Sequence, residues 1–428
     1  MEAEKVAVTF NGLYRDREGR EYEGRIVFDA VREVTARRPC ATCGAPTQDD
    51  TSSFTVEGVT IGKEFHWEEK QRQTFRGELE LVKRAGKVLV INRLPLEWYL
   101  ESVISSEMSP EAPLEFLKAH AVISRSWAMR ILTRQGNCVG APHVAHGQQG
   151  DELSEGLVWY DNEGHEGFDV CADDHCQRYQ GIGRVNEAAV RAVRETAGEV
   201  LTWDGEICDA RFSKCCGGRM ELFSTCWQDR DYPYLRADAD PFCGRAYNEV
   251  KRSTKLNEGA LSTFSFQHSA LTQRILNRWD RGTEFYRWRV EYTDEELGEI
   301  VKEKLGEDLG RIRALEALDR GPSGRIWRLR IVGEKGERIV GKELEIRRVL
   351  SRSHLYSSAF SVTTRRFFNE SDEKNETDEK SLRFVLEGKG WGHGVGLCQI
   401  GAAEMAAEGY GYRAILAHYY PGAKLERR

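Results

Sequence analysis

The sequence lacks several features that would place it in a special class of proteins. No apolar run approaches the roughly 20 residues that a membrane-spanning helix needs. The 62 lysine and arginine residues are outnumbered by 69 aspartates and glutamates, so the net charge of −7 gives no overall positive field for nucleic acid. We find no internal repeat, and residues 1–8 show no apolar segment of a signal peptide. The 41 glycines do not follow the three-residue period of collagen.

What is present indicates a folded protein. The chain has 428 residues, of which 40% are hydrophobic, and its 10 tryptophans, 15 tyrosines and 17 phenylalanines exclude a disordered protein. This length predicts two or three domains of about 100–200 residues each. Alternating apolar and polar residues make 1–94 a β-rich N-terminal part, whereas 95–135 has the period of helices. We expect residues 95–428 to form one mixed body with an additional α/β segment at about 244–345, so the fold class is α+β.

Shorter patterns predict further elements within this body. They are a helix over 187–196, strands over 200–212 around a Trp203-Asp204-Gly205 turn, a helix over 294–304, a hairpin over 326–344, and C-terminal helices over 402–407 and 412–420. Residues 371–380 are all polar and predict an acidic, solvated loop.

The first helix expected over 95–135 carries a carboxylate on its apolar side. Pro95 suits a first helical turn, and the apolar stripe that follows consists of Leu96, Tyr99, Leu100, Val103, Ile104 and Met108. At about 100° per residue, Glu107 lies about 20° from Leu96 and so faces the core, just before Ser109-Pro110 ends the helix. A carboxyl group in an apolar setting keeps its proton more readily, as a general acid requires. The alternative is a glutamate that is solvated in the last turn or caps a neighbouring backbone group.

Two cations lie on the second helix, expected over 114–132. Lys118 and Arg125 are seven residues apart and therefore share one side of this helix, next to its apolar stripe. Beside a buried acid, they would suit an anionic or polyhydroxylated substrate. The alternative is a pair of solvated cations or helix-face ion pairs, worth under about 1 kcal/mol each.

Glycine occupies every second position from Gly388 to Gly396, a segment that we call the glycine ladder. In an extended chain alternate residues share a face, so one face of the ladder would be bare, and a backbone or a ligand could approach it closely. The other face would present Lys389, Trp391, His393 and Val395. Among these, Trp391 and His393 suit stacking on a sugar and hydrogen bonding to its hydroxyls. The alternative is a glycine-rich turn whose tryptophan and histidine fill the core.

The eleven cysteines are too sparse for a disulfide scaffold, and an odd number cannot all pair within one chain. Seven of them lie between Cys171 and Cys243. His165, Cys171, His175 and Cys176 form an H-x5-C-x3-H-C pattern of the residue types that zinc takes as ligands. This spacing matches no zinc finger or ribbon. A Cys171–Cys176 disulfide, or inert thiols beside surface histidines, are the alternatives.

Two further pairs of cysteines stand close together in the sequence. Cys40-x2-Cys43, after Pro39, indicates half of a metal site, a redox pair or a plain turn. Cys215-Cys216-Gly217-Gly218 indicates a tight turn.

Two segments resemble the stage II sporulation protein D (SpoIID) family. Residues 94–132, LPLEWYLESVISSEMSPEAPLEFLKAHAVISRSWAMRIL, are similar to the family's P-L-E-x-Y-L, V-x-x-x-E-M and L-K-A-Q-A-V-A-A-R-T-Y-A pattern. Residues 388–425, GKGWGHGVGLCQIGAAEMAAEGYGYRAILAHYYPGAKL, are similar to its C-terminal G-x-G-W-G-H-G-V-G-M-S-Q-Y-G-A block, and ARFSKCCGG at 210–218 looks like its S-x-C-G-G segment. The chain departs from this pattern at His120, Trp127, Cys398 and Ile400, where Gln, Tyr, Ser and Tyr are usual.

The resemblance implies a SpoIID-like domain over 95–428 and a lytic transglycosylase that acts on peptidoglycan strands stripped of their stem peptides. The acid of the E-M motif falls on Glu107, which would serve as general acid and then as base while a 1,6-anhydro product forms. The resemblance also implies a structural zinc ion held by His165, Cys171, His175 and Cys176. Lys118, Arg125, Trp391 and His393 are then the expected glycan contacts.

A second kind of protein resembles the same family. Amidase enhancers are regarded as binding partners of a peptidoglycan amidase, so the alternative is a protein that binds glycan without cleaving it. The glutamate of the E-M motif is present as Glu107, which favours the enzyme. A peptidoglycan substrate implies the cell envelope, although no leader is visible in the sequence, and we expect neither a nucleic-acid partner nor a transmembrane segment in this chain.

Overall fold

The computed structural model describes residues 2–16, 18–29, 34–36, 53–62, 68–136, 165, 167–173, 175–245, 286–367 and 381–428. Contacts divide the chain into two compact units. Unit 1 comprises residues 1–128 and 163–199 with Arg427, and unit 2 comprises residues 129–162 and 200–426 with Arg428. The expected boundary at 94/95 is therefore not where the contacts divide the chain.

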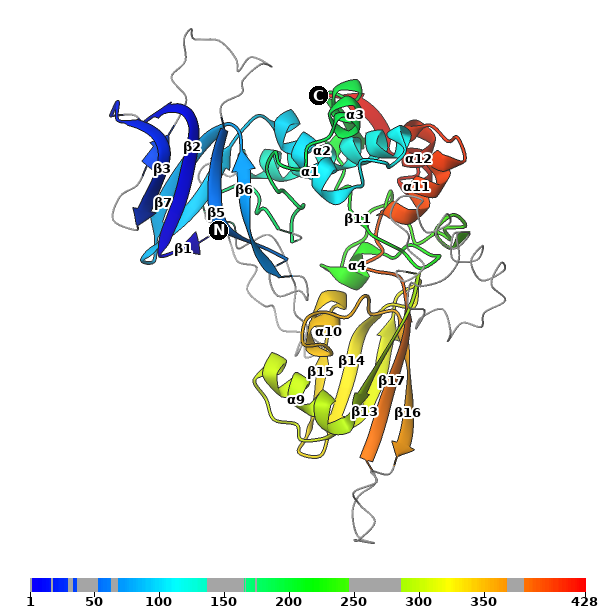
Figure 1. The fold of residues 1–428 in the computed structure, drawn as a ribbon. Coiled ribbons are helices and arrows are strands. Elements are labelled where there is room, and N and C mark those ends of the chain that lie inside the picture. The colour runs from blue at the N-terminus through cyan, green and yellow to red at the C-terminus, as the bar shows by residue number, and fades with distance from the viewer. Residues whose placement is uncertain are drawn as a thin grey trace, which may run out of the picture. The chain divides into compact units, whose positions relative to one another are not determined.

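Unit 1 begins with strands and continues with helices (Figure 1). Its described elements are β1 (Glu2–Ala3), β2 (Lys5–Arg15), β3 (Glu21–Asp29), β4 (Val34–Ala36), β5 (Ser53–Ile61), β6 (Glu69–Phe75), β7 (Glu78–Arg84), β8 (Lys87–Arg93), α1 (Leu96–Glu107), α2 (Leu114–Gly136), whose end belongs to unit 2, and α3 (Glu187–Glu195). The strands form two antiparallel sheets, in the orders β1-β8-β7-β4 and β3-β2-β5-β6. The β-rich N-terminal part and the helical pair after it are thus confirmed.

Aromatic stacking joins the strands of unit 1 to its helices. Phe75 of β6 stacks on Tyr179 with ring centroids 5.8 Å apart, and Tyr179 stacks on Tyr99 of α1 at 5.4 Å. Glu101 of α1 pairs with Arg76, which follows β6. These contacts cross residue 94, which explains why the strands and the helical pair form one compact unit.

Unit 2 mixes short sheets with helices. Its described elements are β9 (Glu199–Trp203), whose first residue belongs to unit 1, β10 (Glu206–Ile207), β11 (Phe212–Ser213), α4 (Phe223–Cys226), β12 (Arg287–Thr293), α9 (Asp294–Leu305), β13 (Ile312–Arg320), β14 (Ile326–Gly333), β15 (Glu337–Val340), α10 (Glu343–Val349), β16 (Phe360–Phe367), β17 (Ser381–Lys389), β18 (Leu397–Cys398), α11 (Gln399–Ala407), α12 (Tyr412–Tyr419) and β19 (Lys424–Arg427), whose last residue belongs to unit 1. The sheets have the orders β10-β9-β19, β12-β17-β16 and β13-β14-β15, and β11 pairs in parallel with β18.

Helices α9 and α10 of unit 2 pack on these strands over a hydrophobic core that includes Leu297, Ile326, Leu329 and Ile346. Helix α9 begins with a capping box between Thr293 and Glu296 and ends at Gly306, whose φ is 72°. Both ends of this helix therefore follow from local sequence.

The α+β class and most of the expected elements are confirmed. Helix α3, the turn at Asp204-Gly205, helix α9 and the two C-terminal helices lie where the patterns predict them. The hairpin of β14 and β15 ends earlier than expected, at Val340, because α10 begins at Glu343. Cys40, Cys43 and the loop 371–380 lie outside the described residues. Among the helices that the structure describes, none combines the length and the apolar character needed to cross a bilayer.

Candidate functional site

Glu107, the expected acid, is the last residue of α1 in unit 1. The helix ends here because Met108 adopts an extended conformation, with φ −120° and ψ 150°, before Ser109-Pro110. The Glu107 side chain is half-buried, and its Oε1 accepts a hydrogen bond from the backbone N–H of Arg178 at 3.0 Å. The predicted burial is therefore only partly correct, since no further turn of α1 covers a side chain at its C-terminal end.

The segment that donates this hydrogen bond is fixed against α1. The Tyr99 hydroxyl donates to Oε1 of Gln177 at 3.3 Å, and the Ser102 hydroxyl donates to the carbonyl of Gly181 at 2.6 Å. Gly181 has a φ of +67°, and a Cβ there would lie 2.1 Å from the carbonyl oxygen of Thr74. Only glycine allows this close approach to strand β6, so residues 177–181 hold the N–H of Arg178 in place beside Glu107.

The four predicted metal ligands come together in unit 1. The ligand atoms of His165, Cys171, His175 and Cys176 all lie within 4.8 Å of one another. Cys176 Sγ lies 3.6 Å from His165 Nε2 and 3.8 Å from His175 Nδ1, and Cys171 Sγ lies 4.0 Å from His175 Nδ1. Tetrahedral zinc with two sulfur and two nitrogen ligands places them roughly 3.5–3.8 Å apart, so this group fits a zinc ion.

The chemistry of this group also suits a metal. Hydrogen bonds from Cys176 and His175 lower the pKa of the Cys171 thiol to about 3, although partial burial opposes this shift. Metals bind the thiolate form of cysteine. Cys171 and Cys176 are free, so the alternative of a disulfide between them does not hold in this structure. Cys176 lies two residues before Arg178, so a metal here would also fix the backbone that reaches Glu107.

The two predicted cations of α2 have partners within unit 1. Lys118 Nζ lies 2.8 Å from Glu115 and 2.6 Å from Glu195. Arg125 is fully buried and forms a two-pronged pair with Glu97, with N–O distances of 2.8 and 2.7 Å. It also donates to the backbone carbonyl of Glu199 at 3.0 Å. The alternative of a helix-face ion pair is therefore present for Lys118, whereas Arg125 is neither solvated nor paired along its own helix. The contact of both residues with glycan stays a prediction.

The glycine ladder lies in unit 2, and its conformation differs from the extended chain that we expected. Only Gly388 belongs to a strand, β17, whereas Gly390, Gly392, Gly394 and Gly396 have φ values between +72° and +84°. A period of two fits both conformations, which is why the sequence pattern alone misled. Glycine is needed here first because L side chains disfavour positive φ.

The predicted close approach to the ladder is confirmed, and the approaching groups belong to the protein. A Cβ at Gly390 would lie 2.8 Å from the carbonyl oxygen of Cys215, and one at Gly394 would lie 2.5 Å from the guanidinium carbon of Arg325. Arg325 is fully buried and donates to the carbonyl of Gly392 from two nitrogens, at 2.9 and 3.1 Å. The bare positions therefore make room for a buried arginine and a neighbouring turn.

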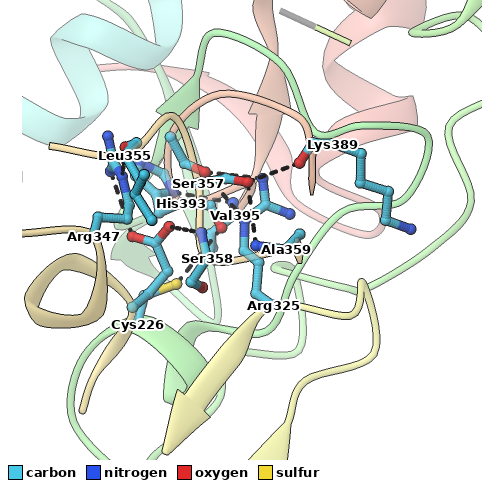
Figure 2. A network of polar contacts seen from close by, with 12 residues as sticks. Cys226, Arg325, Arg347, Leu355, Ser357, Ser358, Ala359, Lys389, His393 and Val395 are labelled. Atoms are coloured by element: carbon cyan, nitrogen blue, oxygen red, sulfur yellow. Dashed lines mark hydrogen bonds and ion pairs between the residues drawn. The ribbon is translucent and has the colours of Figure 1, made fainter. Parts of the chain in front are cut away.

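The two aromatic side chains of the ladder differ in their surroundings. The Trp391 ring is half-buried and lies edge-on to Tyr356, with centroids 4.5 Å apart. His393 Nδ1 accepts the N–H of Val395 at 3.0 Å, and the thiol of Cys226 lies 3.6 Å from the His393 carbonyl (Figure 2). Burial and the nearby charges of Arg211 and Arg325 lower the pKa of His393 well below its ordinary value. His393 is therefore a neutral imidazole with internal partners, and its contact with glycan stays a prediction.

Two features of unit 2 were missed by the sequence analysis. A pocket of about 430 Å³ lies beside Gly388 and is lined by four cationic side chains and one carboxylate, which are Arg287, Arg289, Arg320, Lys389 and Glu387. A second group of candidate metal ligands consists of Cys216, Asp240, Cys243 and Cys398. The pocket and the ligand group both form where strands from distant parts of the chain pair, so no local motif predicts either of them.

Comparisons with known proteins bear on both units. A model of a family described as "Stage II sporulation protein" matches residues 84–203, and a model of a domain of unknown function matches residues 221–396. An uncharacterised protein of Brachyspira hyodysenteriae is 25% identical over 82% of this chain and 72% of its own length. The amidase enhancer of Bacillus subtilis is 24% identical over 76% of this chain but only 40% of its own length. Stage II sporulation protein D of Bacillus amyloliquefaciens is 23% identical over 78% of this chain and 75% of its own length.

Proposed function

Because this chain belongs to the stage II sporulation protein D family, we propose that it acts on the bacterial cell wall as a peptidoglycan lytic transglycosylase. The bond cleaved would join N-acetylmuramic acid to N-acetylglucosamine in denuded glycan strands. The observation that carries the proposal is the position of Glu107. This carboxyl group ends α1, is half-buried, and is held through Oε1 by the N–H of Arg178.

One carboxyl group suffices for this reaction. Protonated Glu107 donates its proton to the glycosidic oxygen, and the bond from that oxygen to C1 of the muramoyl residue breaks through an oxocarbenium-like transition state. The C6 hydroxyl of the same residue then attacks C1, and its proton passes to the Glu107 carboxylate. The ring closes as a 1,6-anhydro sugar, so neither water nor a second carboxylate is consumed. The Arg178 N–H orients the carboxyl group throughout.

The proposed zinc ion has a structural part in this scheme. His165, Cys171, His175 and Cys176 would hold it, and it would supply a rigid link rather than a chemical step. The chain continues from Cys176 directly into residues 177–181, which pack on α1 and β6. Loss of the metal would therefore loosen the backbone donor of Glu107.

Glycan binding is proposed to use the predicted contacts and the basic pocket. A muramoyl residue carries a lactyl carboxylate, and the pocket beside Gly388 has an excess of cationic side chains. Trp391 is the best placed of the predicted contacts, because its ring is half-buried and can stack on a sugar. Lys118, Arg125 and His393 already have partners within the chain, so we assign them a weaker share in binding. With peptidoglycan as the proposed substrate, the proposed location is the cell envelope, outside the cytoplasmic membrane.

The second candidate function is that of a glycan-binding enhancer of a cell-wall amidase. The similarity to the amidase enhancer of B. subtilis favours it. The test is to incubate the purified protein with denuded glycan strands and to analyse the products by mass spectrometry. Release of 1,6-anhydro products by the wild type, and not by Glu107→Gln, supports the enzyme. Binding without any anhydro product from the wild type supports the enhancer and overturns the enzyme.

A further inference from the structure

We propose that Cys216, Asp240, Cys243 and Cys398 form a second zinc site, inside unit 2. Three separate segments supply the ligands. Cys216 lies in the turn after β11, Asp240 and Cys243 lie in the irregular segment after α4, and Cys398 ends β18. All four residues are buried, and their ligand atoms lie within 4.8 Å of one another. This proposal does not depend on glycan cleavage.

Backbone N–H groups donate to two of the sulfur atoms. Cys398 Sγ accepts from the N–H of Cys216 at 3.3 Å and from the N–H of Gly401 at 3.4 Å. Cys216 Sγ accepts from the N–H of Gly218 at 3.4 Å. Such donors stabilise negative charge on sulfur, and the thiolate is the form of cysteine that binds metals. The parallel pairing of Phe212-Ser213 with Leu397-Cys398 brings these sulfur atoms together.

The carboxylate ligand is held in a fixed orientation. Asp240 Oδ1 accepts from the N–H groups of Phe242 and Cys243, at 3.0 and 3.2 Å. Its Oδ2 accepts from the hydroxyl of Tyr419 at 3.0 Å and from the thiol of Cys216 at 3.4 Å. Hydrogen bonds of this kind orient ligands around protein metal ions. Oδ2, which accepts from the Cys216 thiol, is the oxygen that would bind the metal.

The ligand set favours zinc. Three sulfur ligands and one carboxylate oxygen suit a tetrahedral zinc ion, in which ligand atoms lie roughly 3.5–3.8 Å apart. A buried carboxylate beside three thiols is also costly unless a positive charge compensates it, and zinc supplies that charge. The competing arrangement is a disulfide between Cys243 and Cys215, whose sulfur atoms lie 3.4 Å apart. That bond would take Cys243 away from the site.

The metal site would hold the glycine ladder in place at two points. Cys215, next to the ligand Cys216, exchanges two backbone hydrogen bonds with Trp391, at 2.8 and 3.1 Å. Cys398 lies two residues after Gly396, the last glycine of the ladder. One metal ion would therefore fix both the turn that pairs with the ladder and the ladder's own end.

The test measures zinc per chain by elemental analysis in the full-length protein purified under reducing conditions. Cys398→Ser is the main variant, because a serine hydroxyl can still accept the N–H of Gly401 and only the thiolate is lost. It should lose about one zinc ion per chain relative to the wild type. Cys226→Ser is the matched control, since Cys226 is also buried but its thiol donates to the His393 carbonyl, and it should keep the wild-type content.

A second arm separates this site from the zinc site of unit 1. Cys171→Ser breaks the group of His165, Cys171, His175 and Cys176 and should keep about one zinc ion per chain, held in unit 2. Zinc-free Cys171→Ser protein overturns the proposal, even if Cys398→Ser fails to fold. An unchanged zinc content in Cys398→Ser, or a Cys215–Cys243 disulfide found by peptide mapping of the wild type, overturns it as well.

Discussion

The glycine ladder can be tested with two alanine substitutions that share one backbone conformation. Gly396 and Gly306 both have a φ of +72°, and both lie in unit 2. A Cβ at Gly306 would meet nothing within 4 Å, whereas a Cβ at Gly396 would lie 2.0 Å from the carbonyl oxygen of Arg211. Gly306→Ala therefore measures the backbone strain alone, and Gly396→Ala measures the same strain together with the clash.

The expected costs differ enough to be resolved. An alanine in the left-handed region costs about 1–2 kcal/mol of folding free energy, so we expect about that loss for Gly306→Ala. Forcing extra atoms into a packed site costs typically about 1–3 kcal/mol more. The atom in the clash at Gly396 is a backbone oxygen, that of Arg211, which also accepts a hydrogen bond from the N–H of Leu397 at 3.1 Å. This oxygen therefore cannot move away as a flexible side chain could. We therefore expect a total of about 2–5 kcal/mol for Gly396→Ala.

Urea unfolding followed by circular dichroism and tryptophan fluorescence would give both values by linear extrapolation. If the two units unfold in separate transitions, the transition of unit 2 is the one to compare, since both glycines belong to it. Equal losses for the two variants would refute the reasoning. Glycine would then be required at Gly396 only because of its positive φ, and the close approach of Arg211 would not affect the free energy of unfolding.

Four further results are expected. Glu107→Gln should lower the release of anhydro product by about 10²–10⁴-fold without lowering the melting temperature, because the amide oxygen can still accept the Arg178 N–H. The control Glu111→Gln changes an exposed residue and should stay active, and a similar loss of activity in both variants would contradict this role for Glu107. Cys171→Ser should lose about one zinc ion per chain and melt earlier in calorimetry, and unchanged melting would contradict a structural metal. Trp391→Ala should weaken the binding of glycan strands in a pull-down and should lower the free energy of unfolding by less than a core truncation does, which is about 3–5 kcal/mol. Normal glycan binding by this variant would count against the contact. Because burial lowers the pKa of His393, the unfolded chain takes up a proton that the folded chain does not, so the free energy of unfolding of unit 2 should fall as the pH drops below about 6.5. His393→Asn should make this free energy less dependent on pH, and an unchanged pH dependence would exclude His393 as its source.

Local patterns in the sequence predicted the parts of the structure that depend on neighbours in the chain. The apolar stripe gave the bounds of α1, and His165 to Cys176 span few enough residues that one loop can bring them together. The group of Cys216, Asp240, Cys243 and Cys398 escaped prediction because 182 residues separate its first and last members. Their proximity depends on the parallel pairing of β11 with β18, which no local spacing encodes.

The ladder and the acid show a second limit of sequence patterns. Alternation of glycine is compatible with a strand and with a chain in which every second residue is left-handed, and only the φ angles distinguish the two. The helical period put Glu107 on the apolar side of α1, but it could not show that the helix ends at this residue and leaves the side chain only half-buried. The boundary expected at residue 94 stays a prediction, and Arg76 and Phe75 form contacts across it, with Glu101 and Tyr179.

Strands β12 and β17 bear on how the chain could have acquired its second half. Arg287, at the start of β12, is the antiparallel partner of Lys389, at the end of β17, so the polypeptide enters and leaves this region at neighbouring points. Among the residues that the structure describes, the buried side chains of the hydrophobic core between them all come from residues 288–386. A region with its own core and adjacent ends can be gained, lost or exchanged during evolution without moving the flanking chain. Residues 287–389, whose last two residues begin the glycine ladder, therefore have the architecture of an inserted module.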